Sequence, residues 1–334
     1  MKIKRVIFSF MAIFLLASCA DRNNLSIDGT AVNVTEGKVY LQKFNNKMYD
    51  VIDSAEIVDG KFKFAGNVEI PEIYGLTFDA SKAPYMLFLD GNPVTVQLNS
   101  EENYKNTVVA GSALQDLFIA YQAQKDVKID EFIKQNPTSL VAVYALYRNF
   151  SYRLSSEEII ANIQALDPSL LNTPYAKALQ DLVKTMESVA IGKTAPDFTL
   201  PDANGNNVSL SQFFGKSYIL LDFWAAWCGP CRRENPNVVA AFRKFKDQGF
   251  TVFGVSLDHN KEAWLNAIEK DELAWPHVSD LKYWNSAAAA LYGIRAIPSN
   301  LLLDSEGKII AKNLREEALH AKLDELYEKT NMSL

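Results

Sequence analysis

The segment Cys228-Gly229-Pro230-Cys231 places two thiols three positions apart, a spacing that suits thiol–disulfide exchange. An apolar strand is predicted over residues 218–224, and a helix is predicted over residues 232–246. Unpaired amides and the macrodipole at the start of a helix favour a thiolate over a thiol. A fall in the thiol pKa from about 8.5 to about 7 raises the thiolate fraction at pH 7 from about 3% to about half. We therefore predict that Cys228 is the nucleophile and that Cys231 resolves the mixed disulfide.

Other uses of a cysteine pair fit the sequence less well. A zinc site needs further ligands, but no second pair exists and the histidines, His259, His277 and His320, are dispersed. An inert structural disulfide that closes so short a loop restrains little entropy of the unfolded chain. A copper-delivery protein is expected to have a wider cysteine spacing and an accompanying histidine. We predict no metal, and no cofactor other than the redox-active disulfide.

The N-terminus has the features of an export signal. A basic start precedes an apolar stretch over residues 6–17, which is shorter than the roughly 20 residues that span a membrane. The stretch ends in Leu16-Ala17-Ser18-Cys19, which resembles a bacterial lipobox. This resemblance implies a signal peptide over residues 1–18, a lipidated Cys19 and a linker over residues 19–24. An uncleaved anchor and a plain secretory signal are the alternatives. With Cys19 lipidated, the active pair holds the only thiols of the exported chain.

The composition is that of an ordinary globular protein with more than one domain. A length of 334 residues suggests two or three domains, and 48% of the residues are apolar, enough for a sizeable core. The 34 basic and 40 acidic residues give a formal charge of −6. We therefore predict no nucleic-acid partner.

Residues 25–111 are predicted to form an antiparallel β-sandwich or barrel. Short alternating runs recur at residues 37–42, 61–65 and 94–98, and turn signals such as Asp59-Gly60 separate them. The acidic residues of this part are scattered at turns, where solvated or capping roles are usual. No catalytic role is predicted for it.

Residues 112–188 change to a helical period and are predicted to form a helical spacer. Ser155 and Glu158 have the spacing of a capping box, and Thr173-Pro174 is typical of an N-cap followed by proline at the first helical position. The large apolar residues of the segment are expected to pack in a core.

Residues 189–334 alternate between strands and helices, which predicts an α/β domain with helices on both faces of its sheet. The expected elements, in chain order, are a strand over 218–224, a helix over 232–246, a strand over 251–256, a helix over 261–270, a hairpin over 300–312 and a helix over 316–329.

The stretch from Leu221 to Cys231, Leu-Asp-Phe-Trp-Ala-Ala-Trp-Cys-Gly-Pro-Cys, closely resembles the active-site strand and turn of thioredoxin. Pro236 in the following helix and the run from Tyr292 to Ser299, with its Ile-Pro, also match that family. The chain resembles TlpA- and ResA-like envelope reductases of the AhpC/TSA-related superfamily. This implies a thioredoxin-like C-terminal domain and an enzyme, a protein thiol–disulfide oxidoreductase. The β domain and spacer resemble the N-terminal half of certain TlpA-like lipoproteins.

Two carboxylates accompany the cysteines. Asp222 matches the buried aspartate of thioredoxins, and the resemblance implies that it accepts the proton of Cys231. Glu234 matches the glutamate that follows the cysteines in ResA-like reductases. The alternatives are a strand-end Asp222 facing water and an exposed Glu234 on the helix face. ResA-like proteins have no acidic residue at the strand position, so which carboxylate moves the proton stays open.

The resemblance also implies a substrate-binding surface formed by Trp227, Gly229, Pro230, Ile297 and Pro298. With a cis bond before Pro298, Ile297 can offer its backbone to an extended substrate strand beside the nucleophile. An ordinary trans turn is the alternative.

These features predict an envelope lipoprotein that faces the periplasm, reduces protein disulfides and is recharged by a membrane electron-donor protein. Gly229-Pro230 matches the dipeptide of thioredoxin, whose potential is about −270 mV. Apocytochrome c is a substrate that the resemblance suggests, although nothing in these residues selects it. A disulfide oxidase or isomerase and a non-enzymatic scaffold are the alternatives. A thiol peroxidase is excluded, because Ala225 and Leu221 stand where peroxiredoxins have a hydroxyl residue and a proline.

Overall fold

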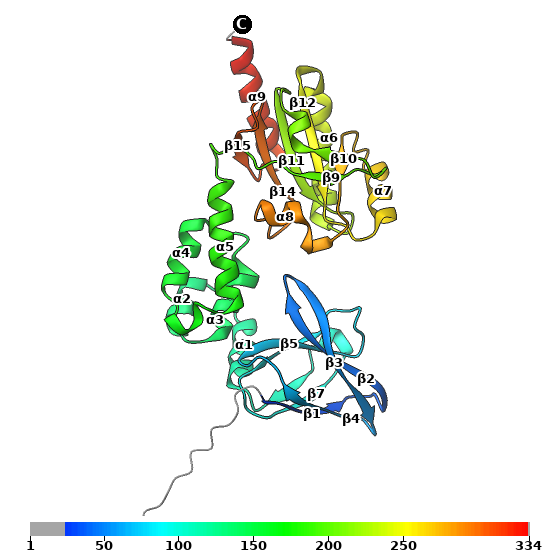
Figure 1. Ribbon diagram of the computed structural model, residues 1–334, viewed down its shortest axis with the longest axis vertical. Coiled ribbons are helices and arrows are strands. Elements are labelled where there is room, and N and C mark those ends of the chain that lie inside the picture. The colour runs from blue at the N-terminus through cyan, green and yellow to red at the C-terminus, as the bar shows by residue number, and fades with distance from the viewer. Residues whose placement is uncertain (1–23, 333–334) are drawn as a thin grey trace, which may run out of the picture. The chain divides into compact units, whose positions relative to one another are not determined.

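The computed structural model describes residues 24–332, so the predicted signal peptide and Cys19 lie outside the described residues. The chain divides into two compact units (Figure 1). One comprises the described residues up to Phe44 together with Tyr49–Ala120. The other comprises Asn45–Met48 and the chain from Tyr121 onward.

The first unit is built on one sheet of eight strands in the order β6-β5-β2-β3-β4-β1-β7-β8. The predicted β domain is confirmed: its strands form one curled sheet (Figure 1), which is not antiparallel throughout. β1 pairs antiparallel with β4 and parallel with β7, because the chain returns late to the free side of its first strand. The strands are β1 (Asn24–Ala31), β2 (Glu36–Asn45), β3 (Met48–Val58), β4 (Lys61–Asn67), β5 (Glu72–Thr77), β6 (Tyr85–Leu89), β7 (Val94–Leu98) and β8 (Val108–Ala110).

Buried apolar and exposed side chains alternate along these strands, and the buried ones form the core of the first unit. In β7, Val94, Val96 and Leu98 are buried while the two residues between them are exposed. Across the sheet, the ring of Phe62 lies over Gly29, where a Cβ would come within 2.0 Å of the ring. Glycine is therefore the residue that lets β1 and β4 pair with an aromatic ring folded over the strand.

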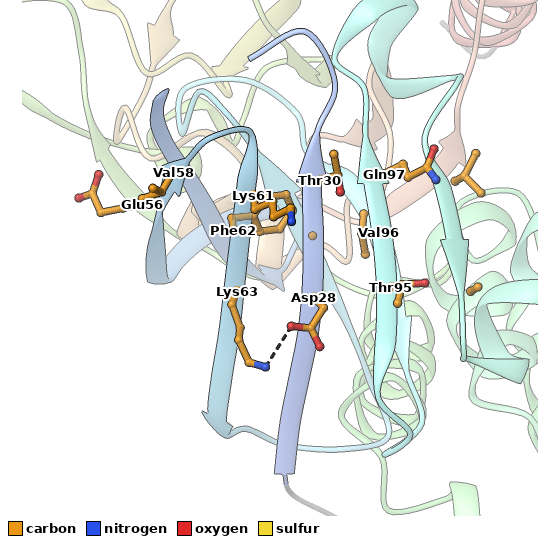
Figure 2. Close-up of a pocket in the computed structure, with 13 residues that line it drawn as sticks. Asp28, Thr30, Glu56, Val58, Lys61, Phe62, Lys63, Thr95, Val96 and Gln97 are labelled. Carbon is orange, nitrogen blue, oxygen red and sulfur yellow. Dashed lines mark ion pairs between the residues drawn. The ribbon is translucent and has the colours of Figure 1, made fainter. Parts of the chain in front are cut away.

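A hollow of about 620 Å³ lies on this sheet, over β1, β4 and β7 (Figure 2). Asp28 and Lys63 pair across it at 3.0 Å, and their side chains are 57% and 62% exposed. An ion pair this exposed contributes at most about 1 kcal/mol to stability. Asp28 thus has the solvated role that was expected of acidic residues in this domain.

The predicted helices of the middle segment are present, and from Tyr121 onward they fall within the second compact unit. Ser155 caps its helix in a capping box with Glu158, and Thr173 caps the helix that Pro174 begins, so both predicted caps are confirmed. The helices are α1 (Ala113–Ala123), α2 (Ile129–Gln135), α3 (Leu140–Ala145), the π-helical η2 (Leu146–Phe150), α4 (Ser156–Gln164) and α5 (Pro174–Ser188).

The second unit also contains a five-stranded sheet in the order β13-β12-β11-β14-β15, with the topology of a thioredoxin-like domain. β11 lies at its centre, parallel to β12 and antiparallel to β14. Most residues of β11 and all residues of β12 are buried, as near-continuous apolar runs predict. The strands are β11 (Tyr218–Trp224), β12 (Phe250–Ser256), β13 (His277–Val278), β14 (Ser299–Asp304) and β15 (Ile309–Lys312), and β9 (Thr199–Pro201) and β10 (Asn207–Ser209) form a separate pair.

Four α-helices accompany this sheet in the described part of the chain: α6 (Gly229–Phe245), α7 (Lys261–Lys270), α8 (Ala287–Leu291) and α9 (Glu316–Met332). α6 packs against α9 and β12. The bounds of β11 and α7 agree with the predicted ranges, while α6 begins three residues earlier than predicted. That earlier start places the cysteine pair at the first turn of the helix.

Candidate active site

Cys228 and Cys231 form a disulfide at the N-terminus of α6. Cys228 is the N-cap of the helix, and its Sγ accepts a hydrogen bond from the backbone N–H of Cys231 at 3.1 Å. Only 3% of Cys228 and 1% of Cys231 is exposed. An amide hydrogen bond and the positive end of a helix dipole both stabilise negative charge on the Cys228 sulfur.

Hydrogen bonds to the backbone of Ala226 fix the loop that carries Cys228. Both carboxylate oxygens of Asp258 accept hydrogen bonds from the Ala226 N–H, at 3.2 and 3.0 Å. The guanidinium of Arg232 donates to the Ala226 carbonyl at 3.2 Å. The backbone of Ala226, two residues before the nucleophile, is therefore held through both its N–H and its carbonyl.

Asp258 and Arg232, which bind the Ala226 backbone, each form further hydrogen bonds. Asp258 is 1% exposed and accepts a hydrogen bond from the Ser256 hydroxyl at 2.7 Å. Burial raises the pKa of Asp258. Arg232 donates to both oxygens of Asp271, which raises the pKa of the guanidinium, and Asn235 donates to the same carboxylate at 2.6 Å. The network joins α6 to the segments that follow β12 and α7.

Asp222 lies within β11, opposite Gly254 of β12 and Asn300 of β14, and is 6% exposed. Burial raises its pKa from 3.8 to about 7; the nearby Arg315 opposes this shift and Glu234 adds to it. A strand-end position in water, the alternative considered for Asp222, is wrong. A carboxyl group with a pKa near 7 is suited to take up and release a proton at neutral pH.

Glu234 is buried on α6, with 8% of its surface exposed, so the alternative of an exposed helix-face charge is wrong. Its Oε1 accepts hydrogen bonds from the Asn237 side chain at 2.8 Å and from the Glu316 N–H at 2.9 Å. Glu316 is the first residue of α9. Glu234 therefore ties the start of α9 to α6 in addition to lying near Asp222.

The residues that were predicted to bind substrate lie in the cysteine loop and beside the end of β11. The Ile297–Pro298 peptide is cis. Ser299 pairs with Phe223, so Pro298 follows the line of β14 to the end of β11, where the cysteine loop begins. Gly229 and Pro230 are exposed in the first turn of α6. The structure brings these residues to one end of the sheet.

Trp227 adds an aromatic surface beside the cysteines. It is 41% exposed, and its indole N–H donates to the Leu257 carbonyl at 3.2 Å. Its ring lies 4.9 Å from that of Tyr283 and 5.9 Å from that of Trp284. Neither Tyr283 nor Trp284 was predicted to belong to the site, because they are remote from the cysteines in the sequence.

The sequence interpretation also missed Asp258, Arg232 and Asp271. A signal for Asp258 existed, since it follows the buried strand β12 and polar residues at the carboxyl ends of parallel strands line the sites of α/β sheets. No comparable signal exists for Arg232 and Asp271, which are 39 residues apart.

Within residues 24–332, no group of three or more His, Cys, Asp or Glu side chains is arranged to hold a metal ion. The dispersed histidines include His277, which is buried and whose pKa burial lowers to about 3. Over the described part of the chain, no helix is both long and apolar enough to cross a membrane.

Comparisons with known proteins agree with the geometry. Residues 191–312 match the AhpC/TSA family, and residues 25–118 match a domain of unknown function, DUF4369. Thiol-disulfide oxidoreductase ResA of Bacillus thuringiensis subsp. konkukian (strain 97-27) is 30% identical over 143 residues, which cover 43% of this chain and 80% of the relative.

ResA of Bacillus subtilis (strain 168) is 32% identical over 124 residues, which cover 37% of this chain and 67% of the relative. Among solved structures, the thioredoxin domain of a thiol-disulfide oxidoreductase from Bacteroides vulgatus is 43% identical. That match covers 41% of this chain and 98% of the solved one, with a TM-score of 0.39.

Proposed function

Since this chain belongs to the family of ResA-like thiol-disulfide oxidoreductases, we propose that it reduces disulfides in protein substrates, with Cys228 as nucleophile and Cys231 as resolving thiol. The chain is an oxidoreductase. The observation that carries the assignment of roles is the hydrogen bond from the Cys231 N–H to Cys228 Sγ at the start of α6. It favours the thiolate on Cys228, and the helix interior around Cys231 does not.

The proposed reaction has two exchanges. The Cys228 thiolate attacks one sulfur of the substrate disulfide, so that a Cys228–substrate bond forms and the second substrate sulfur leaves as a thiolate. Cys231 then loses its proton, attacks Cys228 Sγ and releases the first substrate sulfur. The enzyme gives up two electrons and ends with the Cys228–Cys231 disulfide.

Asp222 is proposed as the group that accepts the Cys231 proton. Its pKa of about 7 lets it gain a proton during resolution and lose it to water between turnovers. Glu234 is proposed to position Asp222 and α9, since its carboxylate already accepts two hydrogen bonds from the protein.

The direction of electron flow is proposed from Gly229-Pro230, the dipeptide of the reducing protein thioredoxin. Trp227, Ile297 and Pro298 are proposed to contact the substrate. An electron-donor protein in the membrane would return the disulfide to the dithiol, since the chain itself supplies only one electron pair. Apocytochrome c is a candidate substrate on the family resemblance alone.

The location is proposed to be the bacterial envelope, facing the periplasm, with lipid on Cys19. The lipobox-like Leu16-Ala17-Ser18-Cys19 supports this. Labelling of cells with a clickable fatty acid tests it. The parent is expected to incorporate label, and a Cys19→Ser variant is expected to lose both label and membrane association.

Reduction of insulin with dithiothreitol as electron source tests the catalytic proposal. We expect turnover by the parent and none above background by Cys228→Ser. The Cys231→Ser variant should accumulate mixed disulfides in cells, and mass spectrometry of these adducts identifies the substrate. Equal turnover by Cys228→Ser and the parent would falsify the proposal and favour a scaffold. A parent that forms disulfides in reduced substrates faster than it breaks them would identify an oxidase.

A further inference from the structure

A cavity of about 420 Å³ lies within the second unit, beside the cis-proline loop. Its wall is formed by Pro298 and Ser299, by the segment around Asn313 after β15, and by the turn before α4 that contains Ser155. The Ser299 hydroxyl donates to Asn313 at 2.9 Å, which fixes two of these segments together. The cavity thus continues the line along which a substrate strand would pass Ile297 and Pro298. Its volume falls in the range of ordinary ligand pockets.

The charges of this cavity are of one sign. Four cationic side chains line it, Arg153, Arg295, Lys312 and Arg315, and none of its lining residues is Asp or Glu. The chain as a whole carries a formal charge of −6, so the cavity opposes the overall charge of the protein. Among residues 24–332, no carboxylate lies within ion-pair distance of any of the four.

Two of these cations, Lys312 and Arg153, have no anionic partner among the described residues. Lys312 is half-buried and has no hydrogen-bond acceptor among the described residues, and burial lowers its pKa. Arg153 is exposed, and its guanidinium carbon lies 4.2 Å from the ring centroid of Phe150 and 5.8 Å from that of Tyr152, with no carboxylate in ion-pair distance among the described residues. A cation left without an anion near a cavity is available to an anionic ligand.

The other two cations are already engaged by the protein. The Arg295 guanidinium lies 4.2 Å from the ring centroid of Tyr147 and donates a hydrogen bond to the Tyr147 hydroxyl at 3.2 Å. The buried Nε of Arg295 has no acceptor in the described structure. Arg315 is attracted electrostatically by Asp222 and Glu234. Arg315 both lines the cavity and interacts electrostatically with these two acids, so its positive charge offsets part of their repulsion of an anion.

We propose that this cavity binds an acidic segment of the substrate protein, next to the disulfide that Cys228 attacks. The inference rests on the proposed reductase function and adds a substrate class to it. An extended chain that pairs with the cis-proline loop would carry its flanking Asp or Glu side chains past Arg153 and Lys312. A cluster of carboxylates in the substrate thereby fixes the register in which its disulfide meets the nucleophile.

The test measures the rate at which the reduced enzyme is oxidised by three peptides with the same internal disulfide and different flanks. The flanks are acidic (Asp and Glu), neutral (Ser and Gln) or basic (Lys and Arg). We expect the parent to react about tenfold faster with the acidic than with the neutral peptide at low salt, and this preference to fall below about twofold near 0.5 M salt.

The variant Arg153→Gln/Lys312→Gln is expected to lose most of the acidic preference while its rate with the neutral peptide stays within about twofold of the parent. A matched control, Lys216→Gln/Lys246→Gln, makes the same change in net charge at exposed lysines outside the cavity and should keep the preference. Should the first variant fail to fold, Arg153→Glu alone changes an exposed side chain and is expected to reverse the preference.

The outcomes separate the two proposals. A parent that reduces none of the peptides contradicts the reductase function. A parent that reduces all three at similar rates, or a control that loses the preference as fully as the cavity variant, overturns the cavity proposal alone. Glutathione disulfide serves as a further substrate, a small anion without a peptide flank. If the cavity cations accelerate its reduction as much as that of the acidic peptide, the cavity binds small anions and the peptide proposal fails.

Discussion

The carboxylate of Glu234, on the first turns of α6, accepts a hydrogen bond from the backbone N–H of Glu316, the residue that begins α9. The helix with the cysteines and the C-terminal helix are thus joined by one buried acceptor. The same oxygen accepts from Asn237 at 2.8 Å. This arrangement gives Glu234 a structural role that is separable from proton transfer.

Glu234→Ala is expected to lower the free energy of unfolding by about 2 kcal/mol, because two donors lose a charged acceptor. Glu234→Gln keeps an acceptor oxygen and should cost less than about 1 kcal/mol with a near-parental rate of substrate release. Denaturant unfolding and single-turnover kinetics measure the two effects. A Gln variant of parental stability that resolves the mixed disulfide tenfold more slowly would show instead that Glu234 carries the proton.

Asp222→Asn is expected to stabilise the oxidised protein in a pH-dependent way. The pKa of Asp222 is 3.8 unperturbed and about 7 in the fold, so between these values the folded state holds a proton that the unfolded state has lost. The stability of the parent therefore falls as pH rises through this window. The free energy of unfolding of the Asn variant, relative to that of the parent, should rise by about 4 kcal/mol between pH 3.5 and pH 8.

Urea unfolding across this pH range measures the trend, and the same substitution at the exposed Asp247 provides the matched control. The same Asp222→Asn change should slow the resolution step by about 100-fold at pH 7, because the proton acceptor is lost. A flat difference in stability with pH would mean that Asp222 is ionised with an ordinary pKa in the fold.

Cys228 is expected to have the lower thiol pKa of the pair. In Cys231→Ser the backbone N–H at position 231 remains and stabilises the thiolate, so Cys228 should react with iodoacetamide about tenfold faster at neutral pH than an ordinary thiol. In Cys228→Ser, the buried Cys231 lacks this stabilisation of its thiolate and should react no faster than an ordinary thiol. Equal alkylation profiles for the two variants would contradict the assignment of nucleophile and resolving thiol.

Asp258→Ala is expected to loosen the cysteine loop. The half-buried Ala226 N–H loses both of its carboxylate acceptors, at a cost of about 2 kcal/mol. Hydrogen exchange at the Ala226 amide should then accelerate by about 30-fold, which corresponds to that free energy. Asp258→Asn retains one acceptor oxygen and should show a smaller change. Unchanged exchange in the Ala variant would show that Arg232 alone holds the peptide.

Local features of the sequence were sufficient for much of the second unit. β11 is a nearly continuous apolar run, and both of its ends were predicted correctly. Ser155 with Glu158, and Thr173 with Pro174, satisfy their helix starts with groups from the same few residues. Cys228 caps α6 for the same local reason. Contacts within three or four residues need no knowledge of the rest of the fold.

The remainder required the tertiary structure, because it depends on segments that only folding brings together. Asp258 reaches Ala226 across 32 positions, and Glu234 reaches Glu316 across 82. The pairing of β1 with β7 cannot be read from alternation, which fixes the buried face of a strand but not its neighbour.

The cation-lined cavity combines the turn before α4 with the loops beside β14 and β15. By itself, the sequence determined the reactive pair, the helix that follows it and two of the nearby carboxylates, Asp222 and Glu234. Only the fold decided which charges meet around that pair, since charge interactions depend on distance through space and on burial.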